Sequence, residues 1–223
     1  RLRRHRRARR YTLRIHPSDR EAILTMPPRG TLAEAKDFAQ RHSGWIAARL
    51  GRLPKAAPFH HGAIIPLRGV AHRIVHRAGE RGTAWTETRD SGERILCVAG
   101  GCEHLDRRVH DFLKREARRD LQKAAQRYAD MLDVKVKRLS IRDQSSRWGS
   151  CTSAGSLSFS WRLILAPPFV LDYLAAHEVA HLVEMNHSPR FWKVVARICN
   201  HVERAKRWLD AEGNDLHRYG IQD

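Results

Sequence analysis

Residues Ala175–Trp192 read AAHEVAHLVEMNHSPRFW and decide how the second half of the chain is interpreted. His177 and His181 are four residues apart, so on a helix both imidazoles project from the same face. That spacing suits two nitrogen ligands of one zinc ion. Glu178 lies about 100° round the helix from His177, where it can accept a proton from water that the metal activates. We therefore predict a catalytic metal site with Glu178 as general base.

A catalytic zinc ion takes three protein ligands and keeps one open position. A continuous helix would carry His187 about 9 Å beyond His181, which is too far for a shared ion. Asn186 tolerates the left-handed conformation that ends helices, and Ser188 and Pro189 are typical of the start of a new helix, predicted over residues 189–202. His187 therefore falls in the bend between two helices, where its side chain can point back toward the ion, and we predict it as the third ligand.

Other acidic and imidazole side chains near this stretch offer alternatives. Glu184 lies one further turn along the face of His177 and is either a competing ligand or a residue that orients one. Glu203, on the following predicted helix, is the ligand that a different zincin arrangement would use. We favour His187 over both, and we expect His201 to be a surface residue.

The segment before the metal helix contains a long helix and a well-patterned strand. Apolar residues of the helix predicted over 105–132 fall on one face: Leu105, Val109, Phe112, Leu113, Leu121 and Ala124. Between residues 156 and 165 apolar and polar residues alternate, which predicts a half-buried strand. If this strand is a sheet edge, it is the expected receptor for an extended substrate. Pro167 and Pro168 then favour the start of a helix over residues 169–184.

The first hundred residues are rich in strands. Residues 10–16 and 21–27 alternate apolar and polar side chains around a turn at 17–19, as in a hairpin. Thr31 and Glu34 form a capping box for a helix over residues 32–50, which Gly51 and Pro54 should end. Further strands are predicted at residues 71–77 and 94–100. We therefore expect an α+β protein, with a strand-rich region over 1–104 and a second domain over 105–223.

Charge and cysteine content indicate the partners and the cellular compartment to expect for the chain. The 223 residues carry a formal net charge of +18, with seven arginines in the first ten residues and a second arginine-rich segment at 107–127. Such a surface attracts polyanions, so DNA is a candidate partner, although a solvated basic face is the common alternative. Four cysteines without CxxC spacing, no apolar run of membrane-spanning length and no visible signal peptide predict a cytoplasmic protein.

Three stretches around the site carry a resemblance: RWGSC (147–151), WRLILAPP (161–168) and DYLAAHEVAHLVEMNHSPRFW (172–192). They resemble the YgjP-like family of zinc metallopeptidases, relatives of the SprT-like and WLM proteases that act on proteins crosslinked to DNA. The resemblance is dense from Arg142 to Trp208. It implies a zincin-like core of helices packed on a small antiparallel sheet. It also implies that the zinc ligands are His177, His181 and His187, with Glu178 catalytic.

Metzincins share the spacing of the three histidines but are excluded. Glu184 stands where metzincins have glycine, and no methionine follows His187 to form their Met-turn. An electrophile for the tetrahedral oxyanion is also needed, and Arg147 and Tyr219 are the candidates. Trp148 is expected in the core, and Asp172 is expected to pair with the helix dipole rather than with the metal.

We predict a Zn²⁺-dependent metallopeptidase that cuts protein or peptide substrates bound as extended strands, with DNA-associated proteins as one substrate class. The alternative is a basic nucleic-acid-binding protein whose zinc is structural. In that case four protein ligands would close the site, with Glu184 or Glu203 as the fourth.

Overall fold

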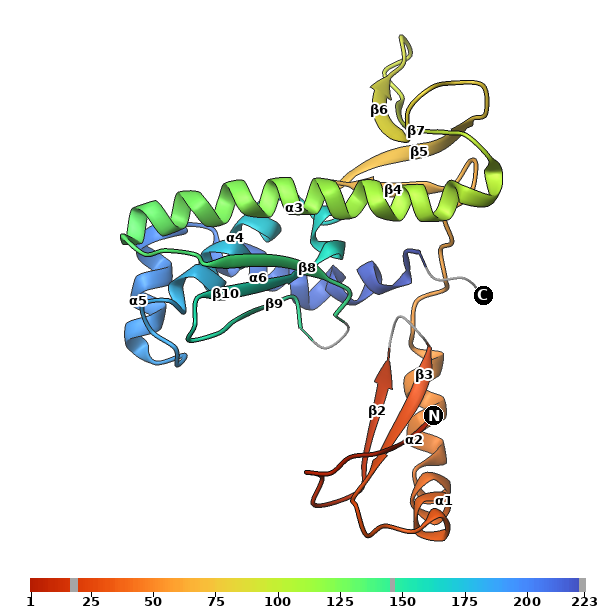
Figure 1. The fold of residues 1–223 in the computed structure, drawn as a ribbon, viewed down its shortest axis with the longest axis vertical. Helices are drawn as coiled ribbons and strands as arrows, with labels where there is room; N and C mark the ends of the chain where they lie inside the picture. Colours follow the sequence, from red (N-terminus) through yellow and green to blue (C-terminus); the bar gives the residue numbers. More distant parts are fainter. Residues whose placement is uncertain (17–19, 145–146, 221–223) are drawn as a thin grey trace. The chain divides into compact units, whose positions relative to one another are not determined.

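A computed structural model describes residues 1–16, 20–144 and 147–220 (Figure 1). The chain divides into two compact units, Arg1–Lys55 and Ala56–Asp223. Both helices and strands are present in each unit, so the fold is of the mixed α+β kind that the sequence predicts. None of the helices in the described ranges has the length and hydropathy that crossing a membrane requires.

The first unit is a three-stranded sheet packed against two helices. Its strands are β1 (Leu2–Arg4), β2 (Thr12–His16) and β3 (Glu21–Met26), in the order β1-β3-β2. The predicted antiparallel pairing of β2 with β3 is confirmed, while the turn predicted at 17–19 lies outside the described residues. The predicted single helix over 32–50 is instead two, α1 (Leu32–Arg41) and α2 (Ser43–Gly51), which meet at His42. Its capping box is confirmed, because Thr31 accepts from Glu34 N–H while Glu34 accepts from Thr31 N–H.

The second unit begins with a four-stranded sheet in the order β4-β5-β7-β6. The strands are β4 (Ile64–Leu67), β5 (Val70–Arg77), β6 (Ala84–Thr88) and β7 (Arg94–Ala99), which include the two predicted near 71–77 and 94–100. Most of their buried side chains share one hydrophobic core with the long helix that follows, while Val75, Ile95 and Cys97 form a separate small cluster. The domain boundary predicted after residue 104 falls inside this unit.

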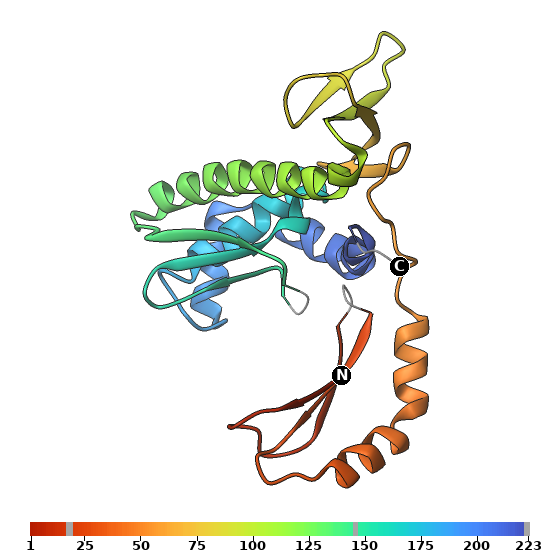
Figure 2. The same ribbon diagram turned by 45° about the vertical axis from the view of Figure 1, so that its right-hand side comes forward.

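The long helix α3 (Leu105–Leu132) follows the short 3-10 helix η1 (Cys102–His104) and has the predicted bounds. All six apolar residues assigned to its inner face are buried. It ends at Asp133, whose φ of 52° lies in the left-handed region. Figures 1 and 2 show α3 running along the second unit, with the remaining helices and a second small sheet beside it. This helix is the frame on which the elements of the candidate site are packed.

The second small sheet contains β8 (Arg138–Arg142), β9 (Gly149–Cys151) and β10 (Ser156–Ser160), in the order β8-β10-β9. It is mixed rather than antiparallel as predicted, because β10 pairs parallel with β8 and antiparallel with β9. The strand predicted over 156–165 ends at Ser160, and residues 161–164 form the 3-10 helix η2 (Trp161–Ile164), which is buried on every side. Since β10 is central, the predicted addition of substrate to this strand is wrong, and β8 and β9 are the two edge strands.

Four further elements complete the unit: α4 (Pro168–Ala180), α5 (Pro189–Ile198), α6 (Val202–Glu212) and η3 (Gly213–Arg218). The predicted helix over 169–184 ends earlier, at Ala180. The helix predicted over 189–202 ends at Ile198, since Cys199 is extended and a new helix starts at Val202. The early end of α4 leaves a turn that contains His187.

Candidate metal centre

Helix α4 is buried around most of its circumference, which fixes the first two histidines. It begins at Pro168, where the missing N–H is harmless, and its side chains Val170, Leu174 and Val179 contribute to the main core. His177 lies in its last turn and His181 at its C-cap, still with helical φ and ψ values. The two imidazoles therefore project from one face of a rigid element, as predicted.

The chain after α4 turns back through a series of tight hydrogen bonds. The N–H groups of Leu182 and Glu184 donate to carbonyls of the last helical turn, at 2.9 and 3.0 Å. Ser188 N–H then donates to Asn186 O at 2.7 Å, an i to i+2 bond that closes a γ-turn centred on His187. The predicted left-handed residue at Asn186 is wrong, because it is not among the described residues with positive φ. The γ-turn provides the bend instead.

The bend brings the three imidazoles together. One ligand nitrogen from each of His177, His181 and His187 lies within 4.8 Å of the other two. The Nε2 atoms of His177 and His187 are 3.1 Å apart. Two nitrogens at zinc-binding distance on a tetrahedral ion would be separated by about 3.3 Å. The three side chains thus fit a single zinc ion.

The protonation of the imidazoles also fits a metal. The Nδ1 of His181 lies 3.1 Å from the backbone oxygen of Glu184, which can only accept, so Nδ1 carries the hydrogen and Nε2 keeps its lone pair. Burial, followed by the charges of the neighbouring histidines, lowers the pKa of His177 to about 4. Burial also lowers the pKa of His181. Neutral imidazoles are the form that binds metal.

Aromatic rings hold the histidines in place. The ring of Phe191 is fully buried, and its centroid lies 4.4 Å from that of His181 and 4.9 Å from those of His177 and His187. Phe191 is positioned by the N-cap of α5, where its N–H donates to Ser188 Oγ. The sequence reasoning missed this residue, although it stands two positions after the predicted Ser188–Pro189 cap, where the first turn of α5 faces the histidines.

Glu178 is buried beside the triad. Only 5% of its surface is exposed. Burial raises its pKa to about 7, and the positive charge of Arg147 acts in the opposite direction. A carboxyl group with a pKa near neutrality can both accept and donate a proton in one reaction cycle. Glu178 therefore has the properties of a general base.

Gly149 of β9 makes room for Glu178. A Cβ atom built on Gly149 would lie 2.6 Å from Glu178 Oε1 and 2.7 Å from its Cγ. Real Cβ atoms do not approach so closely, so any other residue at this position displaces the carboxylate. The role of the glycine in RWGSC was not predicted, because a close approach between strand and helix leaves no pattern in sequence.

We predict that Gly149→Ala lowers peptidase activity more than about tenfold and costs about 1–3 kcal/mol of unfolding free energy, as overpacked substitutions do. The Cβ must push Glu178 away from the triad. Kinetic assays and thermal denaturation check both effects. Gly79→Ala is the matched control, since a Cβ there meets nothing within 4 Å. Full activity in the Gly149 variant would show that the carboxylate needs no fixed position.

A cavity of about 450 Å³ opens beside His177 and Glu178. Arg147, Tyr173 and Lys206 line it, together with Asp210 and the apolar side chains of Trp148, Leu174 and Leu209. Lys206 Nζ lies 4.0 Å from the centroid of Trp192 and 3.2 Å from Glu203 Oε1. The sequence reasoning identified Arg147 but not Tyr173 or Lys206. Trp148 stacks on His217 and packs against the main core.

The other candidates from the sequence lie outside this arrangement. Tyr219 pairs with Ala57 through a backbone bridge and is not among the residues that line the cavity. In the described part of the chain, neither Glu184 nor Glu203 belongs to the group of converging ligand atoms. His201 is partly buried rather than on the surface, and its Nε2 lies 3.2 Å from Asp172 Oδ2.

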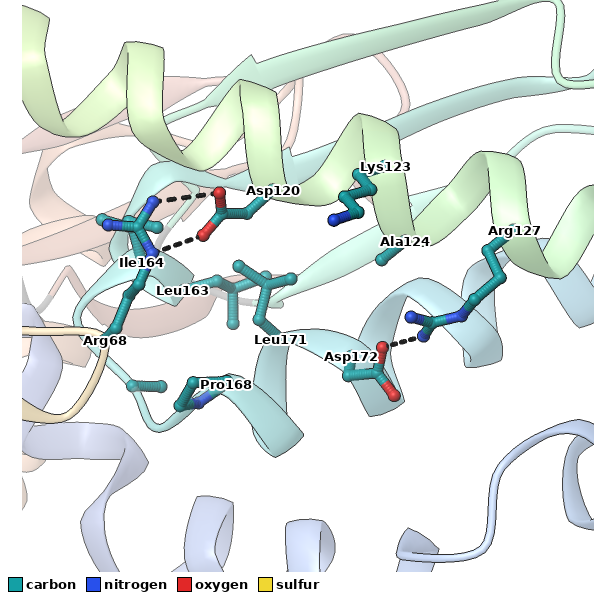
Figure 3. A pocket seen from close by; sticks show the side chains of 11 residues that line it. Arg68, Asp120, Lys123, Ala124, Arg127, Leu163, Ile164, Pro168, Leu171 and Asp172 are labelled. Carbon is teal, nitrogen blue, oxygen red and sulfur yellow. Dashed lines mark hydrogen bonds and ion pairs between the residues drawn. The ribbon is translucent and has the colours of Figure 1, made fainter.

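Asp172 ties α4 to α3. Its carboxylate pairs with Arg127 and accepts from the hydroxyl of Tyr128 at 2.5 Å. Figure 3 shows Arg127–Asp172 and Arg68–Asp120 at two ends of a second cavity, of about 320 Å³, between these helices. Asp172 therefore anchors the metal helix by side-chain contacts, whereas the predicted dipole interaction is wrong, because Asp172 lies beyond the first turn of α4, which contains no acidic residue.

Comparison with known proteins gives one informative match. Residues 9–212 match the family model described as YgjP-like, metallopeptidase domain. No curated protein matches the chain. A solved structure, the metallopeptidase zymogen of Pyrococcus abyssi abylysin, aligns with 44% of this chain and 97% of its own, at 22% identity and a TM-score of 0.38. That score is too low to carry an argument, so the family match alone bears on function.

Proposed function

Because the chain belongs to the YgjP-like metallopeptidase family, we propose that it hydrolyses peptide bonds with a zinc ion held by His177, His181 and His187. The observation that carries this proposal is the convergence of three imidazole nitrogens without a fourth ligand among the described residues. Three nitrogen ligands and an open position are typical of catalytic zinc. A structural zinc site, the alternative function, would need the fourth ligand that Glu184 or Glu203 does not supply here.

Zinc, when bound, would act as a Lewis acid and lower the pKa of water, so that a nucleophile able to attack a carbonyl is available at neutral pH. Glu178 accepts the proton from the attacking water and passes it to the leaving amine. Its burial and a pKa of about 7 support both steps. His181 is held by the Glu184 carbonyl, and Phe191 keeps the three imidazoles from rotating.

Two cations beside the triad can stabilise negative charge that develops on the substrate carbonyl oxygen. Arg147 and Lys206 both line the cavity that contains His177 and Glu178. We assign the electrophilic role to these two side chains in preference to Tyr219, which does not line the cavity. A donor of this kind contributes when it is fixed where the charge forms.

The substrate is proposed to bind as an extended strand along β9. In the described part of the sheet β9 pairs only with β10, so its other edge has free backbone groups. Gly149, at the start of β9, also contacts Glu178, so a peptide added there would run past the catalytic carboxylate. We propose that α4 and this sheet form a zincin-like core, and that DNA-associated proteins are among the substrates.

Metal analysis joined to a cleavage assay tests the proposal. We expect the purified chain to contain about one zinc ion and to cut an unfolded protein such as casein. Chelation should abolish cleavage, and stoichiometric zinc should restore it. A chain that binds zinc firmly yet leaves casein, denatured albumin and a random peptide library intact would contradict the proposal and favour a structural site.

A further inference from the structure

Most of the excess positive charge belongs to the smaller unit. Residues 1–55 contain 15 Lys and Arg and four Asp and Glu, whereas residues 56–223 contain 27 and 20. The net charge is therefore +11 on the first unit and +7 on a second unit three times as long. Thirteen of the 15 basic residues in the first unit are arginines. A charge this concentrated differs from the mixed charge of an ordinary solvated surface.

One face of the first sheet is left open by the helices. Leu13, Leu24 and Met26 point to the side where Ala35 and Phe38 of α1 complete a small core. In the strand registers, Arg3 lies opposite Thr25 and Arg14 opposite Ile23, and side chains alternate along each strand. Arg3 and Arg14 therefore share the opposite face. Figures 1 and 2 show both helices of this unit on one side of its sheet.

The arginines of this face and of the adjacent turn lack acidic partners. We define the arginine surface as the exposed side chains of Arg3, Arg6, Arg7, Arg9, Arg10 and Arg14. No acidic side chain among the described residues pairs with any of them. Of the described acidic residues of the unit, Asp37 pairs with Arg41 and Glu34 accepts from Tyr11 and Thr31. Glu21 is exposed on the same face as Arg14 and pairs with none of the six arginines. The six guanidinium groups are thus available to an external anion.

We propose that the arginine surface binds nucleic acid through the phosphate backbone. Arg3 and Arg14 lie two strands apart and two residues out of register, so their Cα atoms are about 12 Å apart, and the turn at residues 5–10 extends the surface. Each strand of duplex DNA carries one phosphate for about every 3.4 Å of helix axis, and guanidinium groups bind phosphate bidentately. The open face has no aromatic side chain for stacking among its described residues, so contacts with phosphate, independent of base sequence, are expected.

An anionic membrane is a less suitable partner for this surface. Membrane-binding segments combine basic residues with apolar side chains that insert among the lipids. Between residues 3 and 10 the only apolar side chain is that of Ala8. The nucleic-acid proposal concerns residues outside the metal centre, and it stands whether or not the chain cuts peptide bonds.

Fluorescence anisotropy with a 20-base-pair DNA duplex and the full chain tests the proposal, between 50 and 300 mM NaCl. The variant Arg3→Gln, Arg6→Gln, Arg9→Gln, Arg14→Gln should bind about tenfold or more weakly at 100 mM NaCl. The slope of log K against log salt should fall by about 1 for each arginine that contacts phosphate. Two unrelated duplexes should bind wild type with nearly equal affinity.

Matched variants separate local from general charge effects. The variant Arg81→Gln, Lys135→Gln, Arg138→Gln, Arg207→Gln removes the same charge from exposed positions of the second unit that form no ion pair with an acidic side chain in the described part of the chain. It should bind like wild type. A variant in which the same four first-unit arginines are changed to lysine should keep most of the binding. That result would exclude unfolding as the cause of the weaker binding of the glutamine variant. Equal weakening in both glutamine variants overturns the proposal. So does failure of wild type to bind, or tighter binding to phosphatidylserine vesicles at equal anionic charge.

Discussion

Glu178→Gln is expected to reduce kcat about 10²–10⁴-fold, the range that a general base contributes, while the chain keeps its zinc. Glutamine has nearly the shape of glutamate, so the contact with Gly149 and the burial of the side chain are preserved. It cannot accept a proton from water at neutral pH. Since Glu178 is not one of the converging ligands, metal content should not change.

To test this, bound metal and casein cleavage are measured on the same preparation of each variant. Glu212→Gln is the matched control, because Glu212 is an exposed glutamate at the end of α6 and is not among the residues that line the site. It should keep wild-type activity. Undiminished cleavage by the Glu178 variant would mean that another group takes the proton, and the assignment of the base would fail.

His181→Ala is expected to weaken zinc binding by well over 100-fold, since loss even of an outer-shell partner costs about 10–100-fold. The substitution removes the ligand whose tautomer is fixed by the Glu184 carbonyl. Two histidines then remain, which is fewer than a catalytic site uses. Cleavage should be lost together with the metal.

Zinc titration followed by thermal denaturation measures this effect. A ligand at 1,000 times its Kd stabilises the folded state by about 4 kcal/mol, so zinc should raise the Tm of wild type but not of the variant. His181 is buried, so His181→Gln, which fills more of the space, distinguishes ligand loss from a cavity. His104→Ala, at an exposed imidazole, should behave as wild type. An unchanged zinc affinity in both His181 variants would remove this residue from the site.

Features with a strong periodicity were predicted well from sequence. The bounds of α3 and its buried face follow from apolar spacing over 28 residues, and the Thr31–Glu34 capping box is a local pattern. The spacing of His177, Glu178 and His181 indicated a metal centre because a helix converts four residues into one turn. These predictions depend only on neighbours in the sequence.

The errors share a different cause. The strand predicted to continue to residue 165 ends at Ser160, because Arg162 is buried against the core instead of facing solvent, which alternation cannot foresee. The helix predicted through His42 breaks there, where α1 ends and α2 begins. Gly149 and Phe191 were missed because their importance lies in contacts that form only when separate elements pack together, Gly149 of β9 against Glu178 and Phe191 of α5 against His181.

The three predicted ligands are divided between a packed helix and a solvent-facing turn. His177 and His181 belong to α4 and its C-cap, which are held by the core, whereas His187 is exposed and its position depends on the short hydrogen-bonded turn between α4 and α5. We expect this turn, rather than the helix, to govern loading and release of a metal, so that a chelator should empty the protein without unfolding it.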